Sequence, residues 1–143
     1  MTAPVNPDTS LLPQIFEVAM RQLRSGLYEL SDTRFPGLRT RHYRLLSYIP
    51  DDGIRLARVV ERSGLTKQAL AQAMAPLEDG GYLSVRADPD DRRARIVRRT
   101  DRGREVLAAV LGMQTGYERQ WAERVGAERW ARTRDVLDEL FGG

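Results

Sequence analysis

The chain has 143 residues, enough for one domain with a buried core, and its 41% hydrophobic and 30% charged residues are typical of a globular protein. It has no cysteine and one histidine, which excludes disulfides and thiolate metal sites and argues against a histidine-rich metal site. The net charge of +3 and the pI near 9.7 favour a polyanionic partner but decide little alone. Because the first residues lack signal-peptide features and no apolar run is of membrane-spanning length, we expect a cytoplasmic protein without a membrane partner.

A first helix is expected from Ser10 to Asp32, and the segment Phe35-Pro36-Gly37 then breaks the helical pattern. The apolar residues of this helix share one broad face, which is wider than a single partner helix in a small domain would cover. A second chain is therefore expected to cover part of it. The residues on this face are Leu12, Ile15, Phe16, Ala19, Leu23, Leu27 and Leu30.

The next helix is expected over residues 39–49, with His42, Leu45 and Ile49 on its apolar side. A lone histidine on an apolar face is usually a packed residue with one or two hydrogen bonds. The alternative is that His42 edges a ligand cavity.

Residues 54–79 indicate two helices joined by a turn. The first, over residues 54–62, has one apolar stripe that contains Leu56, Val59 and Val60. Gly64 can adopt the left-handed conformation in the turn, and Thr66 suits the cap of the second helix. That second helix is expected to bury Leu70, Ala73, Met74 and Leu77.

The other face of the second helix is polar. Lysine can bind guanine acceptors or phosphates and glutamine can pair with adenine, so this face is suited to a DNA major groove. Exposed lysine and glutamine more often serve solubility alone, and that interpretation stays open. The residues concerned are Thr66, Lys67, Gln68 and Gln72.

A two-stranded hairpin is expected next, with strands over residues 82–86 and 94–99 joined by the turn Asp88-Pro89-Asp90-Asp91. Between Arg86 and Arg104 lie eight arginines and four aspartates, a local charge of +4. Arginine on a protruding ribbon beside a polar helix suits phosphate contacts and a narrow minor groove.

These residues together resemble the winged helix-turn-helix of the MarR family of bacterial transcription regulators. The resemblance is strong through residues 54–103 and extends in helix layout over nearly the whole chain. The aspartate–any–arginine pattern of the family wing falls on Asp91 and Arg93. The segments that carry the resemblance are Gly64–Leu70, Leu77–Leu83, Asp88–Arg93 and Thr100–Gly103.

Two positions depart from the family pattern. Arg99 stands where the family usually has an apolar residue, which either disturbs packing at the end of the strand or adds a DNA contact. Pro76 lies late in the second helix, where it removes the hydrogen bond to the carbonyl of Gln72 and can bend the last turn.

The fold class implied is mainly α with a small β-hairpin wing, in one MarR-like domain spanning 1–143. The winged helix-turn-helix would occupy 38–100, and dimerisation helices would occupy 10–32 and 101–142. From Glu105 to Gly143 there are seven acidic residues and five arginines, so this end offers DNA no basic face. In the family the terminal helices intertwine as a homodimer interface; the alternative is that they pack only within one chain.

The resemblance and the residue chemistry predict a regulator, most often a repressor in this family, that binds a pseudo-palindrome in double-stranded DNA. The wing residues Arg92, Arg93 and Arg95 are predicted to contact DNA, and Asp91 to hold Arg93 by a charge-assisted bond. The residues predicted to enter the major groove are Thr66, Lys67, Gln68, Ala69 and Gln72.

Family members often bind small aromatic or phenolic anions between the dimer arms and the winged domain. This implies a candidate effector pocket, although aromatic residues at helical spacing are more often plain core. The residues proposed to line it are Tyr28, Phe35, Arg39, His42 and Trp121.

Two other classes of function remain. A constitutive architectural DNA-binding protein without a ligand is the main alternative. An enzyme is not expected, and we predict no catalytic residues, metal site or cofactor. The sequence has no phosphate-cradling glycine-rich loop, no metal-ligand spacing and no nucleophile beside its histidine.

Overall fold

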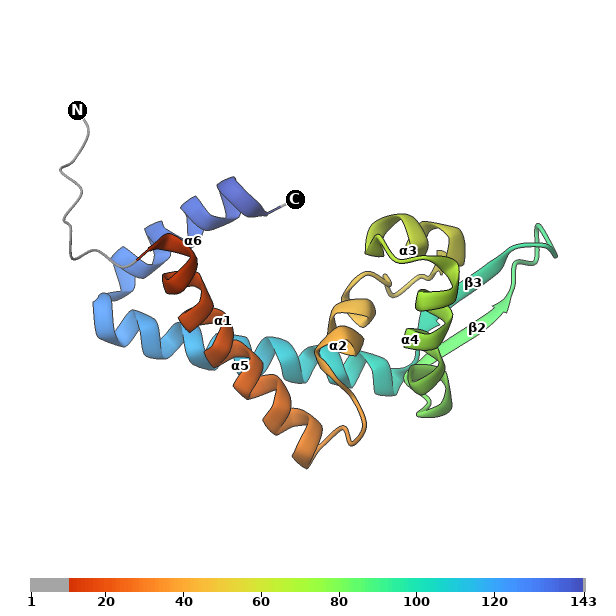
Figure 1. Cartoon of the computed structure of the whole chain (residues 1–143), viewed down its shortest axis with the longest axis horizontal. Helices are drawn as coiled ribbons and strands as arrows, with labels where there is room; N and C mark the ends of the chain where they lie inside the picture. The colour runs from red at the N-terminus through yellow and green to blue at the C-terminus, as the bar shows by residue number, and fades with distance from the viewer. Residues whose placement is uncertain (1–10, 143) are drawn as a thin grey trace.

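The computed structural model describes residues 11–142, so Ser10, the predicted start of the first helix, lies outside the described residues. Long helix α5 runs along the molecule, with a winged domain at its N-terminal end and α1 and α6 packed near its C-terminal end (Figure 1). The predicted fold class is confirmed. The elements in chain order are α1 Leu12–Thr33, α2 Thr40–Ser47, β1 Ile54–Arg55, α3 Leu56–Ser63, α4 Lys67–Asp79, β2 Leu83–Ala87, β3 Arg95–Arg99, α5 Asp101–Val125 and α6 Ala127–Phe141.

The sheet has three antiparallel strands in the order β1-β3-β2. In β1, Ile54 pairs with Val97, while Leu83 of β2 pairs with Arg99 at the base of the wing. The predicted helix over residues 54–62 is therefore wrong at its start, because Ile54 and Arg55 are extended against β3. The hairpin itself is confirmed, with its second strand beginning at Arg95 rather than at residue 94.

The helix-turn-helix forms as its local signals predict. Gly64 ends α3 in the left-handed conformation, with φ of 68°. The hydroxyl of Thr66 accepts the backbone N–H of Ala69 at 3.1 Å, which caps α4. Helix α4 continues through Pro76 to Asp79. The residues that α4 buries are Leu70, Ala73, Met74 and Leu77, as expected.

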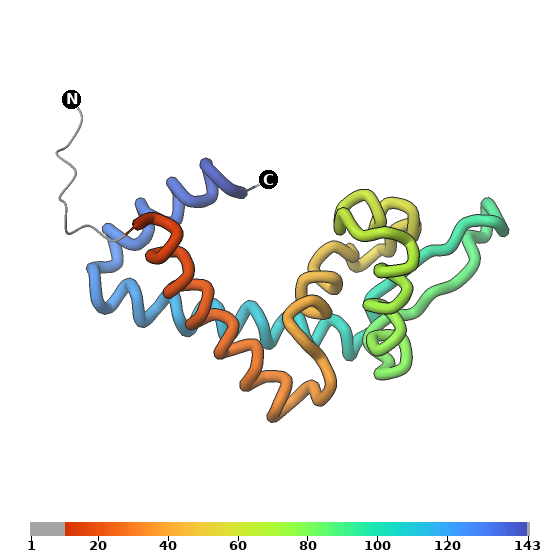
Figure 2. Tube along the Cα trace, viewed as in Figure 1, coloured from red at the N-terminus to blue at the C-terminus, as the bar shows by residue number. Residues whose placement is uncertain are grey.

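The hydrophobic core lies in the winged domain and extends to the first turns of α5. Leu46, Val59, Val97 and Val106 are fully buried, and Val106 belongs to α5, so the long helix shares the core of the winged domain. Farther along α5 the packing is thinner. Helices α1 and α5 cross each other (Figure 2). Gly26 of α1 is close to the side chain of Met113 of α5.

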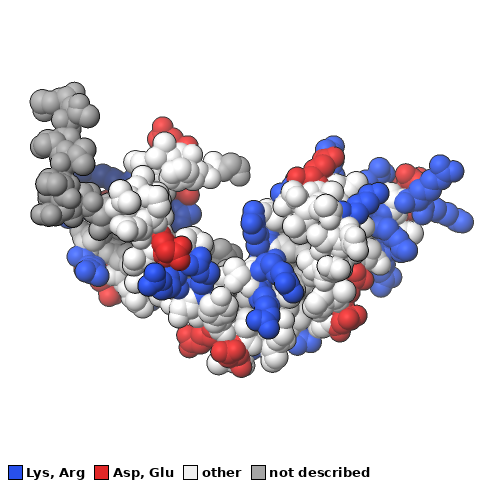
Figure 3. Space-filling view, viewed as in Figure 1, with Lys and Arg blue, Asp and Glu red and all other residues white. Residues whose placement is uncertain are grey.

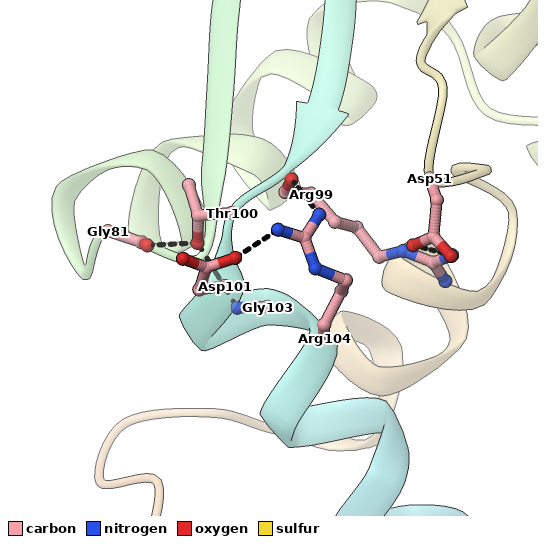
Figure 4. A network of polar contacts seen from close by, with 7 residues as sticks. All are labelled: Asp51, Gly81, Arg99, Thr100, Asp101, Gly103 and Arg104. Carbon is pink, nitrogen blue, oxygen red and sulfur yellow. Dashed lines mark hydrogen bonds and ion pairs between the residues drawn. The ribbon is translucent and has the colours of Figure 1, made fainter.

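The start of α5 is bonded to the base of the wing (Figure 4). The Thr100 hydroxyl accepts the N–H of Gly103 at 3.1 Å and donates to the carbonyl of Gly81 at 2.6 Å. Arg104 pairs with Asp101 and also donates to the carbonyl of Arg99 at 3.3 Å. These bonds fix the direction in which the long helix leaves the sheet.

Arg99 is bonded within the winged domain. Its guanidinium pairs with Asp51 at 2.8 Å (Figure 4) and donates to the carbonyl of Leu46 at 3.4 Å. Only 13% of the side chain is exposed. The charge is thus paired within the domain, and the alternative that this departure from the family pattern adds a DNA contact stays a prediction. Among residues 11–142, no helix is long and apolar enough to cross a membrane.

A substitution at Gly103 tests the junction between α5 and the base of the wing. A Cβ atom there would overlap the carbonyl oxygen of Tyr82, so Gly103→Ala should lower the free energy of unfolding by about 1–3 kcal/mol. Gly112→Ala on the same helix is the control, because its Cβ meets no atom within 4 Å and the helix gains at most about 1 kcal/mol. Urea unfolding followed by circular dichroism measures both, and equal losses in the two variants would contradict the prediction.

Candidate nucleic-acid interface

Helix α4 presents one polar face away from the core. Lys67, Gln68 and Gln72 are exposed, whereas Ala69 is half-buried. Thr66 is exposed and uses its hydroxyl oxygen to cap the helix, which leaves its O–H free to donate. Sequence reasoning missed two exposed alanines on this helix, because alanine carries no polar signal. They are Ala71 and Ala75, whose small side chains let another surface approach the helix closely.

The tip of the wing carries exposed arginines. The side chains of Arg92, Arg93 and Arg95 are exposed, and none has a carboxylate within 4 Å in the part of the chain that the structure describes. Asp91 does support Arg93, but it accepts the backbone N–H at 3.1 Å and not the predicted bond from the guanidinium. The Arg93 guanidinium is therefore left available for an external anion.

Asp88 holds the wing turn to the first strand. It is 4% exposed, accepts the N–H of Asp90 at 2.9 Å and pairs with Arg55 at 2.8 Å. The backbone N–H of Asp90, together with the Arg55 guanidinium, lowers the pKa of the Asp88 carboxyl below its ordinary value. Sequence reasoning identifies Asp88 only as a turn residue, because no local pattern connects positions 55 and 88.

The helix and the wing meet at one cavity. It has a volume of about 440 Å³ between α3, α4 and the sheet, with apolar walls that include Leu56 and Met74. Lys67, Arg93 and Arg95 all line it, so the structure brings these three predicted residues together. Basic side chains also gather over the wing in the space-filling view (Figure 3). Arg55 and the acidic Glu78 line it too, so the lining is positive on balance and suits an anionic ligand.

The five residues of the candidate effector pocket lie in different surroundings. Phe35 is buried edge-on against Tyr82, with ring centroids 6.3 Å apart. Trp121 donates to Gln22 at 3.1 Å, near α1 and α6, while Tyr28 and Arg39 are exposed. A groove of about 620 Å³ does lie between α1 and α5, but its lining residues, which include Gly26, Arg34 and Gly112, contain none of the five.

His42 is a packed, hydrogen-bonded residue, as the first interpretation predicts. It is 1% exposed, and its Nδ1 accepts the N–H of Arg39 at 2.8 Å. The proton of the neutral ring therefore sits on Nε2, and the Arg41 guanidinium 3.5 Å away acts as a nearby charge rather than as a donor. Burial, followed by the charges of Arg41 and Arg39, lowers the pKa of His42.

The chain is similar to known proteins in both sequence and fold. The model of the MarR family matches residues 37–94. The chain is 30% identical over 115 residues to the transcriptional regulator HosA of Escherichia coli O111:H-, covering 77% of this chain and 84% of HosA. It resembles the crystal structure of MarR, with a TM-score of 0.73, 21% identity and coverage of 92% and 95% of the two chains. It also resembles Streptococcus pneumoniae FabT in complex with DNA, with a TM-score of 0.73, 18% identity and coverage of 91% and 90%.

The pKa of His42 predicts a pH dependence of stability. Because the folded pKa lies below the ordinary 6.5, the unfolded chain binds the additional proton as the pH falls. The free energy of unfolding should therefore be constant above about pH 6.5 and should decrease below it. His42→Asn keeps an acceptor for the Arg39 N–H and should remove this decrease, because the chain has no other histidine. Denaturant unfolding between about pH 5 and 8 checks it, and an unchanged decrease in the variant would contradict the assignment.

Proposed function

Because the chain belongs to the MarR family of transcriptional regulators, we propose that it is a repressor that binds a pseudo-palindromic operator as a homodimer. The observation that carries the proposal is the meeting of helix and wing at one cavity, where Lys67, Arg93 and Arg95 converge. Cations from two separate elements then face one polyanion. Such an arrangement gives affinity for any duplex, and base contacts add the specificity.

Helix α4 would supply the base contacts. In this proposal its polar face enters the major groove, where Lys67 binds guanine or phosphate and Gln68 and Gln72 pair with adenine edges. Thr66, whose O–H is free, adds a donor at the start of the helix. Half-buried Ala69 offers a methyl group, which suits contact with a thymine methyl.

The wing would hold the same duplex at a second place. Arg93 is proposed to enter a flanking minor groove, with Arg92 and Arg95 near the phosphates. The support for this is a rigid backbone beneath an exposed side chain. Asp91 holds the backbone of Arg93, and Asp88 joins the turn to Arg55.

A homodimer would place two such units on one duplex. Apolar side chains are exposed on α1 and α6, where Phe16 and Phe141 lie edge-on with centroids 6.3 Å apart. A surface of this kind is typical of an interface. A two-fold axis between the copies would place their two α4 helices about 34 Å apart, which is one turn of DNA. The exposed apolar residues on these two helices include Leu12, Ile15, Phe16, Val18, Met20, Val136, Leu140 and Phe141.

Release by a small aromatic or phenolic effector is the remaining part of the proposal. The dimer would have two conformations, which differ in the spacing of the two α4 helices, and only one of them would fit DNA. A ligand releases DNA only if it binds these two conformations with different affinity. In one chain Phe35 and His42 are buried in the core while Tyr28 and Arg39 are exposed, so in this proposal the partner subunit completes the site.

Arg93→Ala tests the wing. The variant should bind every duplex more weakly, and the slope of log K against log salt should become shallower by about 0.9 for each phosphate that Arg93 neutralises. Fluorescence anisotropy across a salt series measures the slope. Arg132→Ala, on α6 and far from the wing, removes the same charge and should leave binding unchanged. Unaltered affinity of Arg93→Ala at all salt concentrations would exclude the role of the wing.

Gln68→Ala tests the base contacts of α4, and its expected effect differs from that of Arg93→Ala. It should lose about 1–3 kcal/mol of discrimination at particular base pairs while keeping the salt slope. Selection of bound sequences from random DNA, repeated with the variant, identifies those positions. Footprinting on the selected sequence then separates a regulator, which protects a defined palindrome, from an architectural protein.

Leu140→Glu tests the dimer. The side chain is 65% exposed in the single chain, and a carboxylate there would be buried without a partner in the proposed interface. Light scattering after gel filtration should show the mass fall from two chains to one. Ala131→Glu, an exposed position on the same helix, makes the same charge change and should remain dimeric. A dimer that survives Leu140→Glu would place the interface elsewhere.

A further inference from the structure

A second group of arginines lies beside the helix-turn-helix, which we call the α2 cluster: Arg41, Arg44 and Arg62. Tyr48 connects two of them. The Arg44 Nε donates to the Tyr48 hydroxyl at 2.6 Å, and Arg62 donates to the Tyr48 carbonyl at 3.1 Å. Arg41 and Arg44 line a cavity of about 310 Å³. Arg44 thus belongs to both groups: it shares Tyr48 with Arg62 and the hollow with Arg41.

The α2 cluster has no internal counter-charge. Within residues 11–142, none of its arginines lies within 4 Å of a carboxylate. Other arginines of the same domain are paired, such as Arg55 with Asp88 and Arg99 with Asp51. Like charges held together repel, and an external anion would relieve that repulsion.

The position of the cavity indicates which anion. Its other lining residues include Ser63 and Leu65, which lie at the end of α3 and in the turn before α4. The hollow therefore opens next to the end of α4 that carries Lys67. Basic side chains gather over α2 and again over the wing, with α3 and α4 between them (Figure 3). A duplex with α4 in its major groove has phosphates along both borders of that groove.

We propose that the α2 cluster is a phosphate-binding site for the DNA backbone, on the border of the major groove opposite the wing. This rests on the proposed function, since it takes DNA as the ligand. Tyr48 orients the Arg44 guanidinium before binding, so less freedom is lost when it binds phosphate. The site carries no base information; it fixes the angle and register of α4 in the groove.

Arg41→Gln, Arg44→Gln and their combination test the site. The probe is a mixed-sequence duplex of about three helical turns, and fluorescence anisotropy gives its affinity across a salt series. Each variant should make the slope of log K against log salt shallower by about 0.9 for every phosphate that the replaced arginine neutralises, whatever the sequence. Arg44→Lys keeps the charge and should keep the slope. Arg132→Gln on α6 is the charge-matched control.

The outcomes separate this inference from the proposed function. Slopes equal to that of Arg132→Gln, in a protein whose binding still depends on Arg93, would overturn the α2 site alone. Absence of any salt-dependent DNA binding by the wild-type chain would overturn both. If the double variant instead becomes monomeric by light scattering, the cluster faces the partner subunit and the inference is wrong. Thermal unfolding of each variant checks that these exposed substitutions leave the fold intact.

Discussion

The hydroxyl of Thr100 donates to the carbonyl of Gly81 at 2.6 Å and accepts the N–H of Gly103 at 3.1 Å. One side chain thus joins the end of β3, the turn after α4 and the first turn of α5. Arg102 reinforces the joint, because it donates to the Gly80 carbonyl at 2.8 Å and lies over the Tyr82 ring at 4.5 Å. The winged domain and the long helix are therefore one mechanical unit, and a change in the angle of α5 reorients α4 and the wing together.

Arginine has two different uses in this chain, and its partners distinguish them. Arg55, Arg99 and Arg104 pair with aspartates and hold the wing, the sheet and α5 in place. The side chains of Arg92 and Arg93 are exposed, and their guanidinium groups form no ion pair among residues 11–142. Paired arginines build the frame, and the unpaired ones carry the positive potential that a polyanion would meet.

Much of the fold could be predicted because its signals are local. Apolar periodicity, the Thr66 cap and the left-handed Gly64 define the helix-turn-helix within a few residues of each other. The features that could not be predicted depend on contacts between residues far apart in the sequence. Strand β1 forms because Ile54 meets Val97, and Arg99 is neutralised by Asp51, which lies in the turn before that strand. No window of sequence contains both partners. The candidate effector residues Tyr28 and Trp121 show the same limit, since the direction of a side chain on a long helix depends on what packs against it.

Lys67 is the only lysine among 23 basic residues, and it stands exposed on the first turn of α4. The other basic side chains are guanidinium groups, which stay protonated and resist acylation at neutral pH. A reagent that acylates amines would therefore modify Lys67 as the one amine side chain, beside the terminal α-amino group, and leave the arginine side chains untouched. A spectroscopic label attached to the Lys67 amine would lie where helix and wing meet, and a Lys67→Arg variant would show how much of the signal comes from the terminal amine.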